Sequence, residues 1–276
     1  MFTTLIDIDS LLDGYEKSNW LVFDIRYDLA DMDAGKQAYL ESHIPGAIYV
    51  DLHDDLSRLP ATNKGRHPLP TEETMNELFS ELGIQRDSQV IIYDNVFGAF
   101  AARLWWMLRH MQHEHVAVLD GGWQAWMNAD APINSNNEAR KKSEFKKSAI
   151  VEDMINIDQV ESSSLLIDSR EPIRYRGESE PIDKAAGHIP GALNRFWKEN
   201  LSENGFFKEK PILKQEFVEM LGNTSSEESV FYCGSGVTAC HNLLAAVHAG
   251  LELPKLYAGS WSEWSSDPQK PVATGS

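Results

Sequence analysis

The sequence predicts an α/β protein made of two homologous domains, each with a mainly parallel sheet and helices on both faces. The first observation behind this prediction is an internal duplication, because the letters HIPGA occur at residues 43–47 and again at residues 188–192. An Asp-x-Arg motif at residues 24–26 recurs, at nearly the same offset, at residues 168–170. Several identities in the same order are not explained by chance, and a length of 276 residues suits two ordinary domains.

The second observation is the alternation of strand-like and helix-like segments in the first copy. Short apolar runs predict strands at residues 20–24, 48–50, 89–94 and 116–119. Helical spacing predicts helices at residues 72–82 and 100–110, with Thr71 as the N-cap of the earlier helix and Gly83 as its stop. Strands that alternate with helices favour a parallel sheet covered on both faces.

The second copy repeats this order of elements. Its predicted strands are residues 165–168, 230–232 and 255–257, and a helical pattern begins at Val237. A polar stretch without periodicity separates the copies. We therefore predict a first domain at residues 1–133, a linker at residues 134–150 and a second domain at residues 151–276.

Composition limits the classes of function. A formal net charge of −17 disfavours binding to nucleic acid or to anionic membranes, both of which require basic patches. The start of the chain has no basic region followed by an apolar core, no apolar run is long enough to span a bilayer, and two cysteines suit a reducing compartment. We expect a soluble cytoplasmic protein. Without a Cys/His cluster at metal-ligand spacing or a phosphate-binding glycine loop, we expect no metal and no cofactor.

The candidate chemistry lies in the run FYCGSGVTAC at residues 231–240. Cys233 follows a strand-like run and precedes a helix, so backbone N–H groups and the helix dipole converge where a thiolate would be stabilised. Gly234 and Gly236 allow the backbone to curl around that atom. The alternative is a buried structural cysteine in an α/β core.

This loop resembles the active-site loop of the rhodanese and 3-mercaptopyruvate sulfurtransferase family, and the spelling CGSGVTAC is closest to the mercaptopyruvate branch. The resemblance covers nearly the whole chain and implies that Cys233 carries a persulfide sulfur to a thiophilic acceptor. Cysteine-dependent phosphatases have a similar loop, but they need an Arg that clamps phosphate, and residues 233–240 contain no Arg or Lys. In the first copy Asp94 aligns with Cys233 and cannot carry sulfur, so we expect that domain to be catalytically inactive.

The resemblance also implies which residues bind the donor. Arg174 matches the family's carboxylate-binding Arg, and Arg103 matches a second one that the mercaptopyruvate branch takes from the N-terminal domain. An ordinary ion pair is the alternative for each of them. Donor contacts are further expected along the loop, at Gly234, Gly236, Val237 and Thr238.

A proton relay is a further expectation from the resemblance. Some mercaptopyruvate enzymes use an Asp, the His of the HIPGA turn and the loop Ser, which here would be Asp31, His43 and Ser235, with Asp33 as an alternative acid. However, His43 belongs to a duplicated turn. Because the Asp-x-Arg pairs occur in both copies, one of them inactive, we expect them to be scaffold ion pairs, and the same caution applies to His43.

The sequence alone leaves the identities of the sulfur donor and of the sulfur acceptor open. The family serves thiosulfate with basic residues in the loop, and Gly234 and Ser235 occupy those positions here, which favours 3-mercaptopyruvate as the small anionic donor. Thiosulfate sulfurtransferase activity with the same Cys233 is the alternative. A non-enzymatic protein-binding module is a third hypothesis, and the intact loop argues against it. The expected acceptor is cyanide or a thiol, with a thioredoxin-like dithiol among the candidates.

Overall fold

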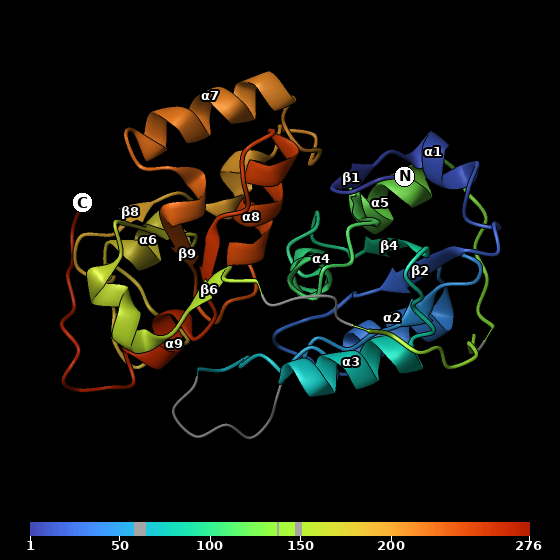
Figure 1. Cartoon of the computed structure of the whole chain (residues 1–276), viewed down its shortest axis with the longest axis horizontal. Coiled ribbons are helices and arrows are strands. Elements are labelled where there is room, and N and C mark those ends of the chain that lie inside the picture. The colour runs from blue at the N-terminus through green and yellow to red at the C-terminus, as the bar shows by residue number, and fades with distance from the viewer. Residues whose placement is uncertain (58–64, 137, 147–150) are drawn as a thin grey trace. The chain divides into compact units, whose positions relative to one another are not determined.

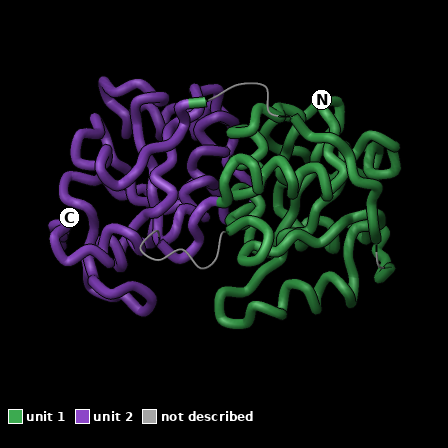
Figure 2. The backbone as a smooth tube through the Cα atoms, turned by 60° about the horizontal axis from the view of Figure 1, so that its bottom comes forward, with its two compact units in different colours: residues 1–57, 70–151 green, residues 58–69, 152–276 purple. Residues whose placement is uncertain are grey.

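The computed structural model describes residues 1–57, 65–136, 138–146 and 151–276. The chain forms two compact units, which Figure 2 shows in different colours. The first unit is Met1–Ser57 with Pro70–Val151, and the second is Arg58–Leu69 with Glu152–Ser276. The predicted limits at residues 133 and 151 stay predictions. The described residues 65–69, which the sequence reasoning left in the first domain, pack with the second unit.

The first unit is built on a five-stranded parallel sheet (Figure 1). In sheet order its strands are β1 (Leu5–Ile6), β5 (Val116–Leu119), β4 (Gln89–Tyr93), β2 (Trp20–Asp24) and β3 (Ile48–Tyr49). Its helices are α1 (Ile8–Leu12), α2 (Ala34–Glu41), α3 (Glu72–Glu81), α4 (Ala101–His110) and α5 (Gly122–Asn128). Every residue of β2 and β4 is buried, as expected for central strands whose two faces are both covered.

The second unit repeats this sheet with the equivalent order of strands. The strands are β6 (Met154–Ile155), β10 (Lys255–Tyr257), β9 (Ser229–Tyr232), β7 (Leu165–Asp168) and β8 (Leu193–Asn194), all parallel. The helices are α6 (Pro172–Tyr175), α7 (Lys210–Leu221), α8 (Ala239–His248) and α9 (Ser260–Trp264), with 3₁₀ turns η1 (Ile157–Ser162), η2 (Trp197–Asn200) and η3 (Ser226–Glu228). Two parallel five-stranded sheets with helices confirm the predicted fold class.

The predicted strands agree with the structure within one residue, and β2, β5, β7 and β10 have the predicted bounds. The helix expected from Val237 begins at Ala239, because Val237 and Thr238 still belong to the loop. The sequence reasoning missed the strands β1, β6 and β8. Each is two residues long, which is too short for a periodic pattern to appear.

The helices pack on the sheets through apolar side chains. In the first unit α4 contacts β4 and β5, and in the second α8 contacts β9 and β10. Trp126 and Trp264 are fully buried at equivalent places, and their indole N–H groups donate to the carbonyl oxygens of Pro132 and Pro271 at 2.9 and 2.8 Å. Within the described ranges, no helix combines the length and the hydropathy that crossing a bilayer requires.

The duplicated Asp-x-Arg motif forms the same buried ion pair in both units. Nη2 of Arg26 lies 2.6 Å from Asp24, and Nη2 of Arg170 lies 2.6 Å from Asp168. In each pair the Arg backbone N–H also donates to the Asp at 2.9 Å, which fixes the turn after the strand. Because the pair recurs beside Asp94, where no sulfur can be carried, it is part of the scaffold, as expected.

The described part of the predicted linker runs along the first unit. Arg140 donates to the carbonyl oxygen of Gly46 at 3.0 Å, and the Ser143 hydroxyl donates to that of Ile84 at 2.6 Å. The Phe145 ring packs edge-on against Phe79, with ring centres 5.1 Å apart. These contacts attach the segment to its neighbours.

Candidate active site

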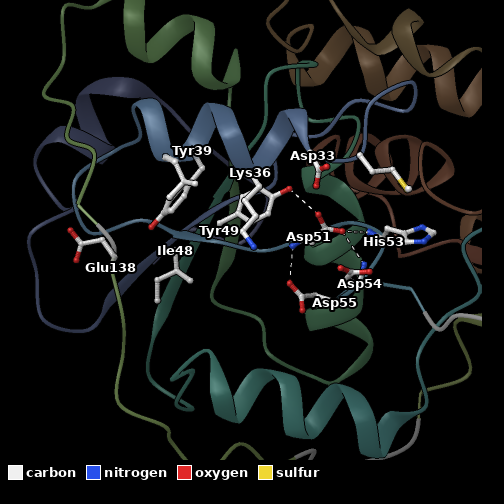
Figure 3. Close-up of a pocket in the computed structure, with 12 residues that line it drawn as sticks. Asp33, Lys36, Tyr39, Ile48, Tyr49, Asp51, His53, Asp54, Asp55 and Glu138 are labelled. Carbon is white, nitrogen blue, oxygen red and sulfur yellow. Dashed lines mark hydrogen bonds between the residues drawn. The ribbon is translucent and has the colours of Figure 1, made fainter.

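The first unit contains a cavity of about 490 Å³ with several carboxylates in its wall (Figure 3). The carboxylates of Asp51 and Asp55 form hydrogen bonds within the chain. Asp51 accepts the Tyr49 hydroxyl at 2.9 Å and the N–H of His53 at 2.7 Å, and its own N–H donates to Asp55 at 2.8 Å. Burial raises the pKa of Asp55 above its usual range. Asp33, the alternative acid of the predicted relay, lines this cavity, whereas the other predicted site residues do not. The described residues contain no cluster of acidic, His or Cys side chains suited to a metal ion.

The loop after β4 shows what the duplicated framework does without a cysteine. The Asp94 carboxylate is fully buried and accepts four backbone N–H groups. Val96 and Gly98 donate to one oxygen at 2.8 and 2.9 Å, and Phe100 and Ala101 donate to the other at 2.8 and 2.9 Å. Burial raises the pKa of Asp94, although these four donors oppose the shift. The loop therefore forms an anion-binding nest that its own side chain fills.

The predicted relay residues of the first unit have other contacts. His43 is buried, its Nδ1 lies 2.6 Å from the Tyr39 carbonyl oxygen, and its ring stacks on Tyr39 at 4.0 Å. His188 repeats this arrangement with Tyr175, at 2.8 and 3.8 Å. Asp31 is exposed and accepts the backbone N–H of Asp33. The repetition of the His–Tyr contact in both units supports a scaffold role for His43.

Arg103, the predicted second carboxylate ligand, lies on α4 and is fully buried. Its Nη2 is 3.5 Å from the carbonyl oxygen of Leu56. A donor contact by Arg103 stays a prediction.

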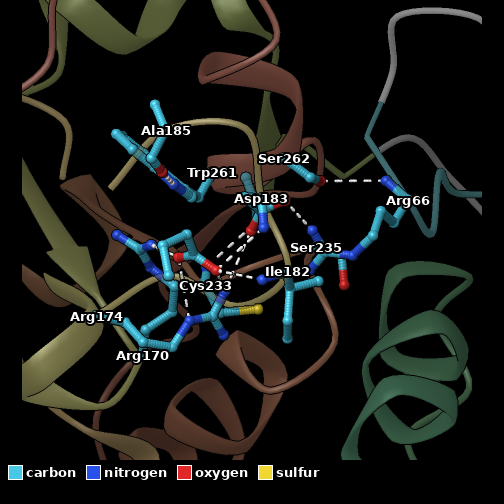
Figure 4. Close-up of polar contacts among 12 residues, drawn as sticks. Arg66, Arg170, Arg174, Ile182, Asp183, Ala185, Cys233, Ser235, Trp261 and Ser262 are labelled. Atoms are coloured by element: carbon cyan, nitrogen blue, oxygen red, sulfur yellow. Dashed lines mark hydrogen bonds and ion pairs between the residues drawn. The ribbon is translucent and has the colours of Figure 1, made fainter. Parts of the chain in front are cut away.

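Cys233 follows β9 directly and is 1% exposed (Figure 4). Its backbone is bound on both sides by the first turn of α9. The N–H of Cys233 donates to the Ser260 hydroxyl at 3.1 Å, and its carbonyl oxygen accepts the N–H of Trp261 at 3.0 Å. The carbonyl oxygen of Gly234 accepts the N–H of Ser262 at 2.9 Å. Cys233 is therefore held by backbone contacts that do not involve its sulfur.

Gly236 gives the loop its sharp turn. Its φ angle is +74°, and a Cβ at this position would lie 2.3 Å from the carbonyl oxygen of Ala258. Gly98 has a similar φ of +90° in the loop of the first unit. Both loops thus contain a glycine with positive φ, although in the first unit Phe97 also has a positive φ of +56°. At Gly236 it is the close approach of the Ala258 carbonyl oxygen that excludes a side chain.

Backbone donors at the start of α8 complete the loop. Among the described residues, the N–H groups of Val237, Thr238 and Ala239 find no hydrogen-bond acceptor. In the first unit the corresponding stretch before and at the start of α4 supplies the N–H groups that hold Asp94. The loop of the second unit therefore has donors available for an external anion, and the dipole of α8 adds to their effect.

Ser235 forms a side-chain contact that the sequence reasoning did not predict. Its hydroxyl lies 2.8 Å from Nδ1 of His67, and both side chains are buried. His67 belongs to residues 65–69, which pack with the second unit. Within the second unit the histidine that contacts the loop serine is therefore His67, whereas the pairing of Ser235 with His43 stays a prediction.

Arg174, the predicted carboxylate ligand, lies on α6 and is already paired (Figure 4). Its Nε and Nη2 contact Glu180 at 3.1 and 2.7 Å, and Nη2 also contacts Asp183 at 3.2 Å. A Cβ placed on Gly234 would lie 3.7 Å from its Nη1. The guanidinium thus reaches the loop while two carboxylates of the chain hold it.

A second guanidinium reaches the same point. Arg66 donates its backbone N–H to Ser262 at 3.1 Å and forms an ion pair with Asp183. A Cβ on Gly234 would lie 2.9 Å from its Nη2. Burial raises the pKa of Asp183, although Arg66 and Arg174 oppose the shift. Burial also acts to raise the pKa of Glu180, but hydrogen bonds from Arg174 and from backbone N–H groups outweigh burial, so the pKa of Glu180 lies below its usual value.

The sequence reasoning missed both His67 and Arg66. They follow a glycine in a segment without periodicity, so the only local signal was the presence of two chemically suitable side chains in a loop. The other expected donor contacts, at Gly234, Gly236, Val237 and Thr238, stay predictions.

Comparison with known proteins identifies the family. The model of the Rhodanese-like domain matches residues 7–129 and 147–267. A protein described as a probable 3-mercaptopyruvate sulfurtransferase from Pseudomonas aeruginosa is 41% identical over 280 residues, which cover 98% of each chain. A putative thiosulfate sulfurtransferase from Mycobacterium tuberculosis is 35% identical over 262 residues, or 92% of this chain and 90% of that protein.

Solved structures agree with the sequence comparison. The 3-mercaptopyruvate sulfurtransferase from Leishmania major superposes with a TM-score of 0.86 at 29% identity, covering 98% of this chain and 76% of that one. The two family matches fall one on each unit and confirm the predicted duplication. The chain therefore belongs to the rhodanese family, as a tandem-domain member similar to the 3-mercaptopyruvate sulfurtransferases.

Proposed function

We propose that the protein transfers a sulfur atom from 3-mercaptopyruvate to a thiol or cyanide acceptor through a persulfide on Cys233. The observation that carries this proposal is the loop of the second unit, where Cys233 is followed by the Ser235–His67 pair and by three backbone N–H groups without an acceptor in the described part of the chain. The relatives named as 3-mercaptopyruvate sulfurtransferases support the choice of donor.

In the first half-reaction the Cys233 thiolate attacks the sulfur of mercaptopyruvate. An S–S bond forms and the C–S bond breaks, and its electron pair becomes the enolate of pyruvate. The enolate must be stabilised and then protonated to pyruvate. The N–H groups at the start of α8 are suited to hold the negative charge of the persulfide, as the equivalent N–H groups hold Asp94 in the first unit.

The Ser235–His67 pair is suited to supply that proton. In the tautomer with its proton on Nε2, His67 accepts the Ser235 hydroxyl through Nδ1, and in the protonated form it donates to the same oxygen. Ser235 can then pass a proton toward the enolate while His67 replaces it. We propose this pair as the relay, in place of His43 with Asp31.

In the second half-reaction an acceptor thiolate attacks the outer sulfur of the persulfide. An S–S bond to the acceptor forms, the bond to Cys233 breaks, and the Cys233 thiolate returns. A thioredoxin-like dithiol is a suitable acceptor, because its second thiol can release the sulfur by forming a disulfide. Both cysteines of the chain are free, which suits the reducing conditions of the cytoplasm, our proposed location.

Thiosulfate is the second candidate donor, and one observation favours it. Sequence reasoning disfavoured this dianion because the loop itself carries no cation, but Arg66 brings a guanidinium against Gly234 from outside the loop. Expulsion of sulfite would be helped by such a charge. The putative thiosulfate sulfurtransferase among the relatives is consistent with this candidate.

Intact-mass spectrometry tests the persulfide. Incubation with 3-mercaptopyruvate should add the mass of one sulfur atom to the wild-type chain, and Cys233→Ser should show no adduct, while Cys240→Ser retains it. The same experiment with thiosulfate ranks the two donors. If neither donor adds sulfur, the proposed activity is wrong and a protein-binding role of the fold takes its place.

A further inference from the structure

Three arginines and three carboxylates form one cluster of ion pairs near the Cys233 loop, and Figure 4 labels the arginines and one of the carboxylates, Asp183. Arg170 is committed to Asp168 and Glu180, at 2.6 and 3.2 Å, and Arg174 forms a two-point contact with Glu180. Asp183 is the third carboxylate, and it is shared by Arg66 and Arg174. With three charges of each sign, the cluster is close to neutral.

The position of Asp183 is unusual for a structural partner. Its side chain is 4% exposed, whereas those of Arg66 and Arg174 are 32% and 16% exposed. Both guanidinium groups reach Gly234, the residue that follows Cys233, with Arg66 the nearer of the two. A carboxylate that bridges two arginines next to the reactive cysteine occupies the place where a carboxylate of an anionic donor would bind best.

An anionic donor cannot simply join this cluster. A fourth carboxylate beside the intact pairs would face Asp183, and like charges in a partly buried site repel. Releasing Asp183 removes that repulsion, frees the Arg66 guanidinium from its ion pair and leaves Arg174 held only by its two-point contact with Glu180. Asp183 lies in a segment between α6 and β8 without regular structure, flanked by the exposed Ile182 and Lys184, so the surrounding backbone does not lock its side chain into a helix or strand.

We propose that Arg66 and Arg174 together bind the carboxylate of the donor, and that Asp183 is an internal competitor that the donor displaces from both. This inference rests on the proposed function and adds a specificity-determining residue, Arg66, and a residue that weakens donor binding, Asp183. The alternative is a structural one, in which the Arg66–Asp183 pair only fastens residues 65–69 to the second unit.

Pyruvate is the probe that distinguishes donor binding by Arg66 and Arg174 from the purely structural role of the Arg66–Asp183 pair. It has the carboxylate and keto group of the donor but no sulfur to transfer. Its binding to Cys233→Ser is measured by calorimetry, and the same titration is run with Asp183→Asn and Arg66→Ala added. Asp183→Asn keeps the size and removes the charge, so pyruvate should bind several-fold more tightly. Arg66→Ala removes one charged hydrogen-bond donor and should weaken binding about 10- to 100-fold.

Arg176→Ala is the matched control. Arg176 lies in the same unit but pairs with the exposed Glu178, so its removal should leave pyruvate binding unchanged. Arg66→Lys keeps the charge without the fork and should restore binding only in part. Thermal melts on all variants report whether residues 65–69 have lost their attachment.

Two results would overturn the proposal. The first is weaker or unchanged pyruvate binding in Asp183→Asn, which is what a structural fastening predicts. The second is a change in the binding of sulfite, titrated in parallel, with no change in the binding of pyruvate in the Arg66 and Asp183 variants. That result would mean that Arg66 serves only the thiosulfate reaction. Failure of the proposed function is recognised separately, by the missing sulfur adduct on the wild-type chain, since pyruvate binding needs no sulfur transfer.

Discussion

The loop after β4 and the loop after β9 share one backbone design and differ in what fills it. Each begins after a central strand, its first carbonyl oxygen accepts a Trp N–H at 2.8 or 3.0 Å, and each turns at a glycine with positive φ. In the first unit the Asp94 carboxylate takes four N–H donors for itself. In the second, the side chain is a thiol, and three donors have no acceptor within the described residues.

This difference shows how a duplicated nest can serve stability in one copy and chemistry in the other. A buried N–H group without an acceptor costs free energy, so the first loop is stabilised by an anion that never leaves. In the second loop three N–H groups have no acceptor among the described residues, and under the proposed function they are available to a transient anion. Strain or unsatisfied donors that persist at one of two equivalent places are a physical indication of function.

The largest expected effect comes from making the second loop resemble the first. Cys233→Asp should abolish sulfur transfer, because a carboxylate cannot carry sulfur, and its oxygens should occupy the N–H groups at the start of α8. We therefore expect Cys233→Asp to unfold at a temperature no lower than that of Cys233→Ser. Donor kinetics and thermal melts measure both properties. A melting temperature far below that of Cys233→Ser would mean that the two nests are not equivalent.

The next prediction separates the two histidines. His67→Gln should lower kcat for 3-mercaptopyruvate about 10²- to 10⁴-fold, the usual contribution of general acid-base catalysis, whereas Ser235 and Cys233 remain in place. His43→Gln should mainly reduce stability, because it removes the contact with the Tyr39 carbonyl oxygen. Steady-state kinetics and urea unfolding on both variants make the comparison. An equal loss of kcat in His43→Gln would indicate that His43, the histidine of the HIPGA turn, takes part in the proton relay.

Removing the internal anion of the first unit is expected to act on stability alone. Asp94→Ala leaves four buried N–H groups without an acceptor and should cost about 3–5 kcal/mol of unfolding free energy. Asp94→Asn keeps one carbonyl oxygen and should cost less. Urea unfolding followed by tryptophan fluorescence gives both values. If Asp94→Ala loses sulfur transfer per folded molecule but no stability, the first loop has a role other than structural.

The smallest effect concerns helices that differ between the units. The Thr71 hydroxyl caps α3 by accepting the N–H of Thr74 at 3.3 Å, whereas Glu209, at the start of α7, forms no side-chain cap. Thr71→Ala should therefore reduce stability by about 1 kcal/mol, and Glu209→Ala by less. The difference in urea midpoints measures this contrast, and equal midpoints would show that the cap contributes nothing.

The sequence by itself determined the features that depend on local pattern or on repetition. Hydrophobic period and turn residues are local, so adjacent residues were enough to predict the strand lengths and the helix that follows the loop. Comparison of the two repeated segments was enough to predict the duplication and the replacement of the cysteine by Asp94. Cys233 could be singled out for the same reason, since a strand, a glycine turn and a helix start meet within ten residues.

Only the tertiary structure decided which distant side chains belong to the proposed site. His67 lies 168 positions from Ser235, and Arg66 lies 117 positions from Asp183, so no local pattern connects them. Their segment packs with the second unit although it precedes most of the first unit in the chain. The bridge by Asp183 between two arginines is likewise decided by packing, because the direction of a side chain depends on the folded backbone and the neighbours that enclose it.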